Sequence, residues 1–330
     1  MPPLYELLVS ISLWFQGFGA WLFPIMKGIT VLGNEEFYLL ILPALYWCIN
    51  QQIGLQIGIM LLVSSGINFH LKLAFHSPRP YWVSRDVKNI VSNTSFGFPS
   101  GHAQNAASIW GLMAVKIRER WIKSLFVLLI ILIGISRLVL GVHFIHDVIG
   151  GWIIGGIILA LFILFKKPVT DMFMNLSFRM RTAVTFLISL AFITIAIFFV
   201  SPLMDYNIPD TWVNNVGGSF HPLNLEGIFT ISGVFFGLLS GVYLLQEEGG
   251  YNAAGVLWKR ILRYPLGLVG VLILYLGLDA LFPREASSLS MTLRYLRYLM
   301  IGIWISYGAP RIFYGMGLAN QKPDLPDGDQ

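Results

Sequence analysis

Three short stretches of the sequence combine basic, hydroxyl and imidazole side chains at defined spacings. The first reads Lys-x6-Arg-Pro and begins at Lys72. The second is Pro-Ser-Gly-His, which ends at His102. The third reads Ser-Arg-x5-His-x3-Asp and ends at Asp147. Because only 12% of the residues are charged, these clusters are the clearest candidates for a functional site.

The cations and the small residues of these stretches suit an anion. Lys72, Arg79 and Arg137 are three cations, and a cationic pocket with guanidinium forks favours a phosphate dianion. Ser100 precedes an uncharged run that we expect to be helical, so it is a plausible N-cap beside free backbone amides. Gly101 allows the backbone to come close to a ligand. We therefore predict a phosphate-binding site.

The remaining residues suit transfer of a phosphoryl group. His143 and Asp147 are spaced i, i+4 and share a helix face. A carboxylate on one ring nitrogen leaves the other nitrogen as a nucleophile, and His102 remains as the proton donor to a leaving alkoxide. His143, His146 and Asp147 could instead bind a metal, but three neighbouring cations would repel it. We expect no metal and no other cofactor.

The elements that position these residues are predicted to be membrane-spanning helices. The chain has 330 residues, of which 56% are hydrophobic, whereas soluble domains carry about 25% charged residues. This composition excludes a soluble globule, a disordered chain and a disulfide-stapled domain with its single cysteine. A net charge of +5 gives no case for nucleic-acid binding. We expect an all-α polytopic membrane protein.

Charge-poor runs of about 20 residues predict about nine spans, beginning with a hairpin in Phe37–Leu71. Residues 1–33 carry Trp and Phe without an early basic residue, which favours an interfacial helix over a signal peptide, with a tenth span as the alternative. Gly150–Gly156 predicts close helix packing. The positive-inside rule places the three clusters at the extracytoplasmic face of a plasma or inner membrane.

The three motifs together resemble the signatures of the type-2 phosphatidic acid phosphatase superfamily, which includes lipid phosphate phosphatases, glucose-6-phosphatase and vanadium haloperoxidases. The resemblance implies a six-helix phosphatase core in residues 34–167, with hydrolysis that needs no metal. It implies His143 as the nucleophile that forms a phosphohistidine, Asp147 as its orienting partner and His102 as acid and base. The phosphate-binding residues that it implies are Lys72, Arg79, Ser100, Gly101 and Arg137.

The substrate is less well defined by the sequence. A site at the outer end of a helical bundle favours a phosphate carried by a membrane lipid: a phosphatidate-like lipid, phosphatidylglycerophosphate or a polyprenyl pyrophosphate. A phosphotransferase that passes the group to an alcohol uses the same residues, and a sugar phosphatase resembling glucose-6-phosphatase is a further alternative. A non-enzymatic lipid-binding or transport protein is disfavoured by the complete set of catalytic residue types.

Residues 168–330 match no motif and form a C-terminal transmembrane extension of unknown role. Within it, Asp205–Leu225 is polar and could cover the site. Arg294–Tyr298 places two arginines and two tyrosines at an expected helix end, where they could contact a lipid headgroup. We favour interfacial anchoring as the role of both segments.

Overall fold

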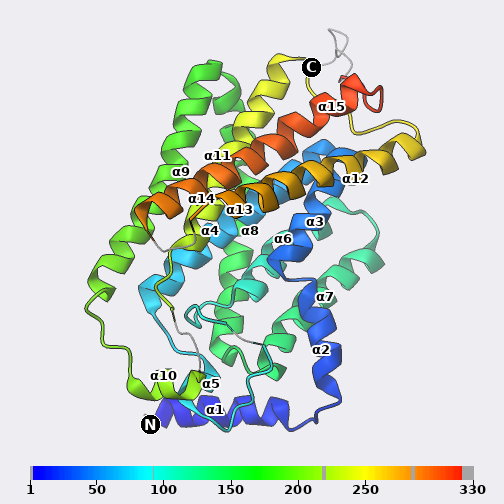
Figure 1. The fold of residues 1–330 in the computed structure, drawn as a ribbon. Coiled ribbons are helices and arrows are strands. Elements are labelled where there is room, and N and C mark those ends of the chain that lie inside the picture. The colour runs from blue at the N-terminus through cyan, green and yellow to red at the C-terminus, as the bar shows by residue number, and fades with distance from the viewer. Residues whose placement is uncertain (1–2, 92, 218–220, 284–286, 322–330) are drawn as a thin grey trace. The chain divides into compact units, whose positions relative to one another are not determined.

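The computed structural model describes residues 3–91, 93–217, 221–283 and 287–321, apart from the side chains of residues 35 and 36. In these ranges the chain is all-helical and forms no β-strand (Figure 1), although Asn252 and Asn320 make an isolated bridge. The α-helices are α1 (Pro3–Gln16), α2 (Leu22–Val31), α3 (Glu35–Ala44), α4 (Gln51–Phe75), α5 (Pro80–Val83), α6 (Gly101–Lys116), α7 (Arg120–Val139), α8 (Ile145–Met174), α9 (Phe178–Val200), α10 (Asp210–Val216), α11 (Glu226–Glu247), α12 (Leu257–Leu272), α13 (Leu278–Leu281), α14 (Ser288–Ile303) and α15 (Ala309–Gly315).

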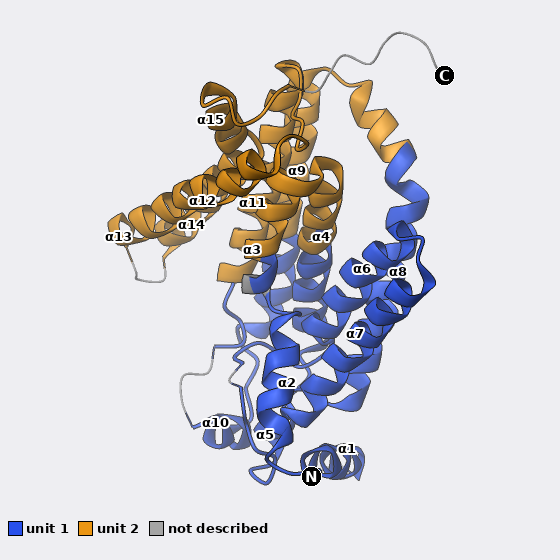
Figure 2. Ribbon diagram, turned by 90° about the vertical axis from the view of Figure 1, so that its right-hand side faces the viewer, with its two compact units in different colours: residues 1–38, 63–167, 194–225 blue, residues 39–62, 168–193, 226–330 orange. Residues whose placement is uncertain are grey.

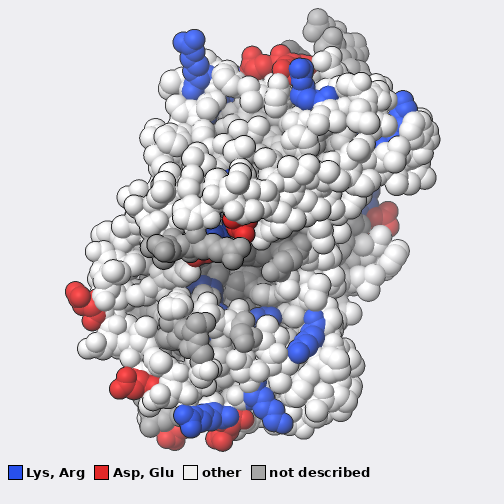
Figure 3. All heavy atoms as spheres, viewed as in Figure 1, with Lys and Arg blue, Asp and Glu red and all other residues white. Residues whose placement is uncertain are grey.

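Six helical segments of the described chain are long and apolar enough to cross a membrane. The face drawn in Figure 3 is mostly free of Lys, Arg, Asp and Glu, as expected of a surface that meets lipid. The count of about nine spans stays a prediction. Two further apolar helices, Leu22–Val31 and Phe37–Ile49, are shorter than these six segments. The six segments are Gln51–Val83, Arg120–Val139, Ile145–Met174, Phe178–Leu203, Glu226–Glu247 and Leu257–Leu281.

The chain packs into two compact units, coloured separately in Figure 2. Unit 1 contains residues 1–38, 63–167 and 194–225. Unit 2 contains residues 39–62, 168–193 and 226–330. Each unit is therefore assembled from segments that are distant in the sequence.

In unit 1, buried polar side chains join α4 to α6. Ser64 Oγ donates to Asn105 Oδ1 over 2.7 Å, and Asn68 Nδ2 donates to Gln104 Oε1 over 2.9 Å. Gln104 Nε2 in turn donates to the Ser64 carbonyl over 2.7 Å. Because buried polar groups are costly unless paired, this network fixes how the two helices align. It thereby fixes the start of α6.

Two glycines of α8 bring that helix against the start of α6 in unit 1. A Cβ at Gly151 would lie 2.6 Å from the Ser100 carbonyl oxygen, and one at Gly155 would lie 2.3 Å from the Gln104 carbonyl oxygen. Neither position has room for a side chain. The close packing predicted for the Gly150–Gly156 stretch is therefore present at these two positions.

The N-terminal helices of unit 1 pack on the same region. Leu8 and Val9 of α1 form a buried cluster with Val87 and Phe144. Helix α2 packs along α7. Figure 1 shows α1, α5 and α10 together at one end of this unit, and contacts join α5 to both of the others.

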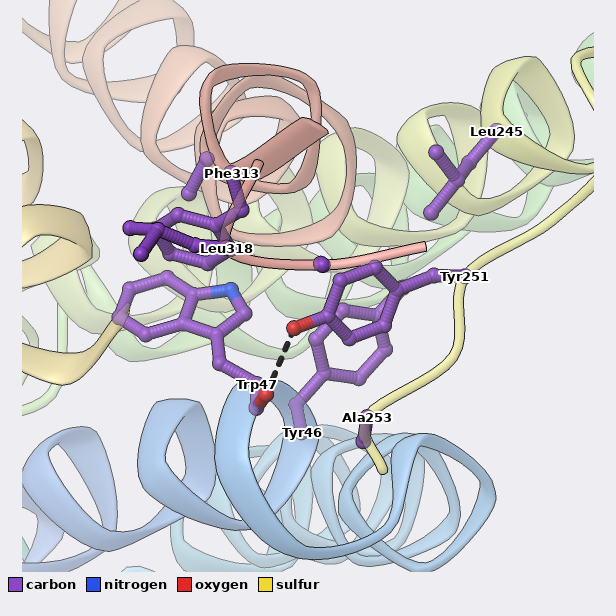
Figure 4. Packing of buried hydrophobic residues seen from close by; sticks show 9 residues of the cluster. Tyr46, Trp47, Leu245, Tyr251, Ala253, Phe313 and Leu318 are labelled. Carbon is purple, nitrogen blue, oxygen red and sulfur yellow. Dashed lines mark hydrogen bonds between the residues drawn. The ribbon is translucent and has the colours of Figure 1, made fainter. Parts of the chain in front are cut away.

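Unit 2 has its own aromatic core. Tyr251 donates from its hydroxyl to the Trp47 carbonyl over 2.6 Å, as the dashed line in Figure 4 shows, and Trp47 is packed edge-on against Phe313. The guanidinium of Arg263 is buried beside them. It donates five hydrogen bonds to the backbone carbonyls of residues 47, 253, 254 and 318. These bonds satisfy a buried cation without a carboxylate.

Candidate active site

All eight residues that the sequence proposes for a site lie in unit 1, at helix ends. Lys72 lies in the last turn of α4, Arg79 immediately before α5, Ser100 at the N-cap of α6, Gly101 and His102 in the first turn of α6, Arg137 in the last turn of α7, His143 between α7 and α8, and Asp147 in the first turn of α8.

His143 and Asp147 form a buried pair. The ring Nδ1 lies 3.3 Å from Asp147 Oδ2, and the exposed fractions are 2% for His143 and 0% for Asp147. The same carboxylate oxygen accepts the Phe144 backbone N–H over 2.9 Å, which fixes its orientation. A carboxylate can only accept, so Nδ1 carries the proton and Nε2 keeps its lone pair.

Arg79 holds the other side of the His143 ring. Its Nη1 lies 3.2 Å from His143 Nε2 and donates to the Val142 carbonyl over 2.8 Å. Its Nε donates to the Ser95 carbonyl over 2.6 Å. The guanidinium is 1% exposed. Arg79 is thus fixed by several bonds, with one nitrogen directed at the free lone pair of the imidazole.

The loop after α5 holds Lys72. Its ammonium donates to the carbonyl of Phe96, an oxygen that Arg79 also contacts. The following residue, Gly97, donates to the Ser77 carbonyl over 2.8 Å, and a Cβ there would lie 2.6 Å from the Pro78 carbonyl oxygen. The same Cβ would lie 3.2 Å from Asp147 Oδ2, so this closely packed loop contacts both the first and the third cluster.

Two buried donors of this region have no hydrogen-bond partner within the described ranges: Ser100 Oγ and Arg137 Nε. Ser100 is 0% exposed and its backbone N–H donates to the Asp147 carbonyl over 3.0 Å. It is the N-cap of α6, as predicted, but its side chain makes no capping bond. Such unsatisfied groups are costly, and both are suited to a ligand oxygen.

Two contacts of this region were not predicted from the sequence. Thr30 Oγ1 in α2 accepts from Arg137 Nη1 over 2.6 Å. Asn34 Oδ1 lies 2.8 Å from His102 Nε2. Asparagine and threonine in an apolar N-terminal segment carry no periodic signal that links them to motifs far along the chain. An interfacial helix over residues 1–33 predicts no contact with the site.

Both histidines proposed for catalysis titrate below their usual range. Burial away from water is the largest cause, and the charge of Arg137 the next, that lowers the pKa of His102 well below the ordinary value of 6.5. Desolvation, then the charge of Arg79, does the same to the pKa of His143. Each imidazole is therefore neutral near pH 7 when no anion is bound.

His146 is placed beside the pair by aromatic stacking. Its ring is nearly parallel to those of Phe98 and Phe144, with centroids 6.0 and 5.7 Å away. Its Nε2 lies 3.1 Å from Asp147 Oδ1. His146 therefore contacts one oxygen of the carboxylate while His143 contacts the other.

Comparison with known proteins identifies the family. The PAP2 superfamily profile matches residues 53–171, and the profile of the PAP2 superfamily phosphatase transmembrane extension matches residues 229–321. Phosphatidylglycerophosphatase B of Bacillus subtilis (strain 168) is 33% identical over 159 residues, which cover 44% of this chain and 74% of that protein. The chain belongs to the PAP2 superfamily, as the motifs indicated.

Other relatives differ in the length that they match. Sphingosine-1-phosphate phosphatase 1 of Mus musculus is 25% identical over 88% of this chain and 71% of its own length. Glucose-6-phosphatase 3 of Homo sapiens is 25% identical over 57% of this chain and 60% of its own length. The solved structure of a transmembrane PAP2 type phosphatidylglycerolphosphate phosphatase from Bacillus subtilis matches with a TM-score of 0.45 and 26% identity, over 51% of this chain and 89% of that one.

Proposed function

We propose that this protein hydrolyses a phosphomonoester or pyrophosphate carried by a membrane lipid, through a phosphohistidine at His143 and without a metal. One observation carries the proposal: a buried histidine has its Nδ1 against a carboxylate and its Nε2 against Arg79. Phosphoryl transfer needs a nucleophile with a free lone pair beside positive charge. The family assignment agrees with a phosphatase.

In the first step, His143 Nε2 attacks phosphorus. The N–P bond forms as the P–O bond to the lipid breaks, and protonated His102 gives its proton to the leaving alkoxide. Asp147 stabilises the ring as it becomes positively charged. The products are a lipid alcohol and phosphohistidine.

In the second step, neutral His102 takes a proton from water, and the water oxygen attacks phosphorus. The N–P bond breaks, inorganic phosphate leaves, and His143 regains its lone pair. His102 returns to its protonated state, so protons balance over the cycle.

The charge that develops on the phosphoryl oxygens is offset by the proposed clamp. Arg137 Nε and Ser100 Oγ are buried donors suited to such oxygens, and Arg79 and Lys72 add positive charge. The amides at the start of α6, beginning with Gly101, add the partial positive charge of a helix N-terminus. Preorganised donors of this kind supply most of the stabilisation in phosphoryl transfer.

A lipid phosphate is the substrate that the comparisons favour. The sphingosine-1-phosphate phosphatase matches 88% of this chain, whereas the glucose-6-phosphatase matches 57%. The phosphatidylglycerophosphatase is the relative with the higher identity, 33%. Phosphatidylglycerophosphate, a sphingoid phosphate, phosphatidic acid and a polyprenyl pyrophosphate are therefore the substrates to test first, with glucose 6-phosphate as the soluble comparison.

The proposal is tested by phosphate release from the purified protein in detergent with EDTA present. Turnover of at least one lipid phosphate is expected, and His143→Ala should abolish it. His221→Ala is the matched control, because this histidine is exposed and lies outside the three motifs. Full turnover by His143→Ala would refute the nucleophile assignment. A radiolabelled donor incubated with alcohols separates hydrolysis from transfer, because only transfer yields a new phosphoester.

A further inference from the structure

The short turn between α2 and α3 contacts the ring of His102 at two points. A Cβ at Gly33 would lie 3.2 Å from His102 Cδ2 and 3.0 Å from Ile133, so the turn packs closely on the ring. The next residue, Asn34, places its Oδ1 2.8 Å from His102 Nε2. This turn lies before residues 53–171, which the PAP2 superfamily profile matches.

Asn34 occupies a position where asparagine often has a local role. Its carbonyl accepts the Tyr38 N–H over 3.3 Å, so Asn34 begins α3. Asparagine at such a position commonly turns its side-chain oxygen to the N–H groups of its own helix. Here that oxygen lies 2.8 Å from Nε2 of His102, on an element far away in the sequence.

An amide oxygen accepts hydrogen bonds and cannot donate them. The ring nitrogen that faces it, Nε2, must therefore carry a proton, and Nδ1 is left as the nitrogen that gains and loses one. We propose that Asn34 is a positioning residue that holds His102 with Nδ1 available to exchange a proton with the leaving group and water. This inference rests on the function proposed above.

The two histidines of the site have different partners. His143 faces the carboxylate of Asp147, which suits a ring that becomes positively charged as a nucleophile. His102 faces a neutral amide. The charged or titratable groups whose fields act on it are Arg137, His143, Arg79 and Lys72. A neutral partner orients the ring without holding the proton, so the ring can release it to a leaving group.

The test uses two probes that differ in their need for an acid. Dodecyl phosphate leaves as an alkoxide that must be protonated, whereas 4-nitrophenyl phosphate leaves as a stable phenolate. Formation of the phosphoenzyme is followed in the first turnover, so that the later water step does not contribute. Asn34→Ala should lower the rate with dodecyl phosphate at least about tenfold, a part of the 10²–10⁴-fold worth of a positioned acid. With 4-nitrophenyl phosphate the change should stay within about twofold.

Asn34→Asp provides the conservative rescue. The carboxylate keeps the acceptor for Nε2, so first-turnover activity with dodecyl phosphate should rise above that of Asn34→Ala. It also stabilises the charged ring, so the alkaline limb of the kcat profile should move to higher pH by roughly one unit. A residue that acts only in packing would not move this limb.

Thr30→Val is the matched control from the neighbouring helix. It removes the hydrogen bond to Arg137 and should affect both probes equally, because an arginine of the clamp acts whatever the leaving group. The inference is overturned if Asn34→Ala keeps full activity with dodecyl phosphate, or loses both probes equally with an unchanged pH profile.

The titration of His102, followed by NMR of the ring carbons in detergent and assigned with His102→Gln, separates this inference from the proposed function. An upward shift in Asn34→Asp supports the contact even if the wild-type protein releases no phosphate, a result that refutes the function alone. An unchanged titration overturns the inference even if the protein is an active phosphatase.

Discussion

At the scale of single residues, the site depends on which atom each imidazole turns to its neighbours. His143 has its Nδ1 3.3 Å from a carboxylate and its Nε2 3.2 Å from a guanidinium nitrogen. His102 has its Nε2 2.8 Å from an amide oxygen. On this geometry we propose that His143 attacks phosphorus and that His102 exchanges a proton.

The lowered pKa values predict an acidic optimum for kcat/KM. As the pH falls, His143 gains a proton and loses its lone pair; as the pH rises, His102 loses the proton that the leaving group needs. Because both pKa values lie below the ordinary value of 6.5, both limbs should lie below about pH 6.5. Rates with dodecyl phosphate, corrected for the measured titration of the substrate, test this. An alkaline limb above about pH 7 would contradict the assignment of His102.

Bound phosphate should raise the pKa of His102, because its negative charge offsets the surrounding cations. The alkaline limb of kcat, which reports the enzyme–substrate complex, should therefore lie at higher pH than that of kcat/KM.

At the scale of elements, helix packing places the start of α6 beside His143 and Asp147. The hydrogen bond between Asn68 and Gln104 ties α4 to the first turns of α6. The two close glycines of α8 pack against the carbonyls of Ser100 and Gln104 in the same region. The first turn of α6 carries three of the proposed site residues at its N-cap and first two positions.

Two adjacent glycines of α8 provide a matched pair for testing this packing. A Cβ at Gly155 would lie 2.3 Å from a carbonyl oxygen of α6, whereas one at Gly156 would meet nothing within 4 Å. Gly155→Ala should destabilise the protein by about 1–3 kcal/mol through overpacking. Gly156→Ala should leave the stability unchanged or slightly raise it. Thermal unfolding in detergent measures both, and equal effects would contradict this account of α8.

The sequence predicted some of these elements better than others. Motif spacing singled out Lys72, Arg79, Arg137 and His143 because such ionisable residues are rare in an apolar chain, and the structure places all four at helix ends in unit 1. The number of membrane spans was harder to predict from the sequence. Helix α6 carries a buried polar side made of Gln104 and its neighbours, which lowers its hydropathy, while α2 and α3 are only 10 residues each. Contacts such as that of Asn34 with His102 depend on the tertiary fold and leave no local pattern.

At the scale of the whole molecule, we propose that the site opens on the extracytoplasmic side of the membrane. The sequence supports this through basic residues gathered at 116–123, 166–181 and 246–263, segments that the positive-inside rule places in the cytoplasm. A lipid phosphate would then reach the site from the outer leaflet.

Accessibility to a membrane-impermeant thiol reagent tests this topology. Cys48 is the single cysteine, so Cys48→Ser provides a background without thiols. Lys88→Cys, exposed in the loop before α6, should be labelled in intact cells. Arg118→Cys, exposed between α6 and α7, should be labelled only after permeabilisation. The reverse pattern would place the site on the cytoplasmic side.

The central claim, a phosphohistidine at His143, is tested most directly by trapping the intermediate. The protein is mixed with radiolabelled 4-nitrophenyl phosphate and quenched in alkaline detergent, in which phosphohistidine persists. Label is expected on the wild-type protein, with more on His102→Ala because the water step lacks its base, and none on His143→Ala. Label on His143→Ala at the wild-type amount would contradict it.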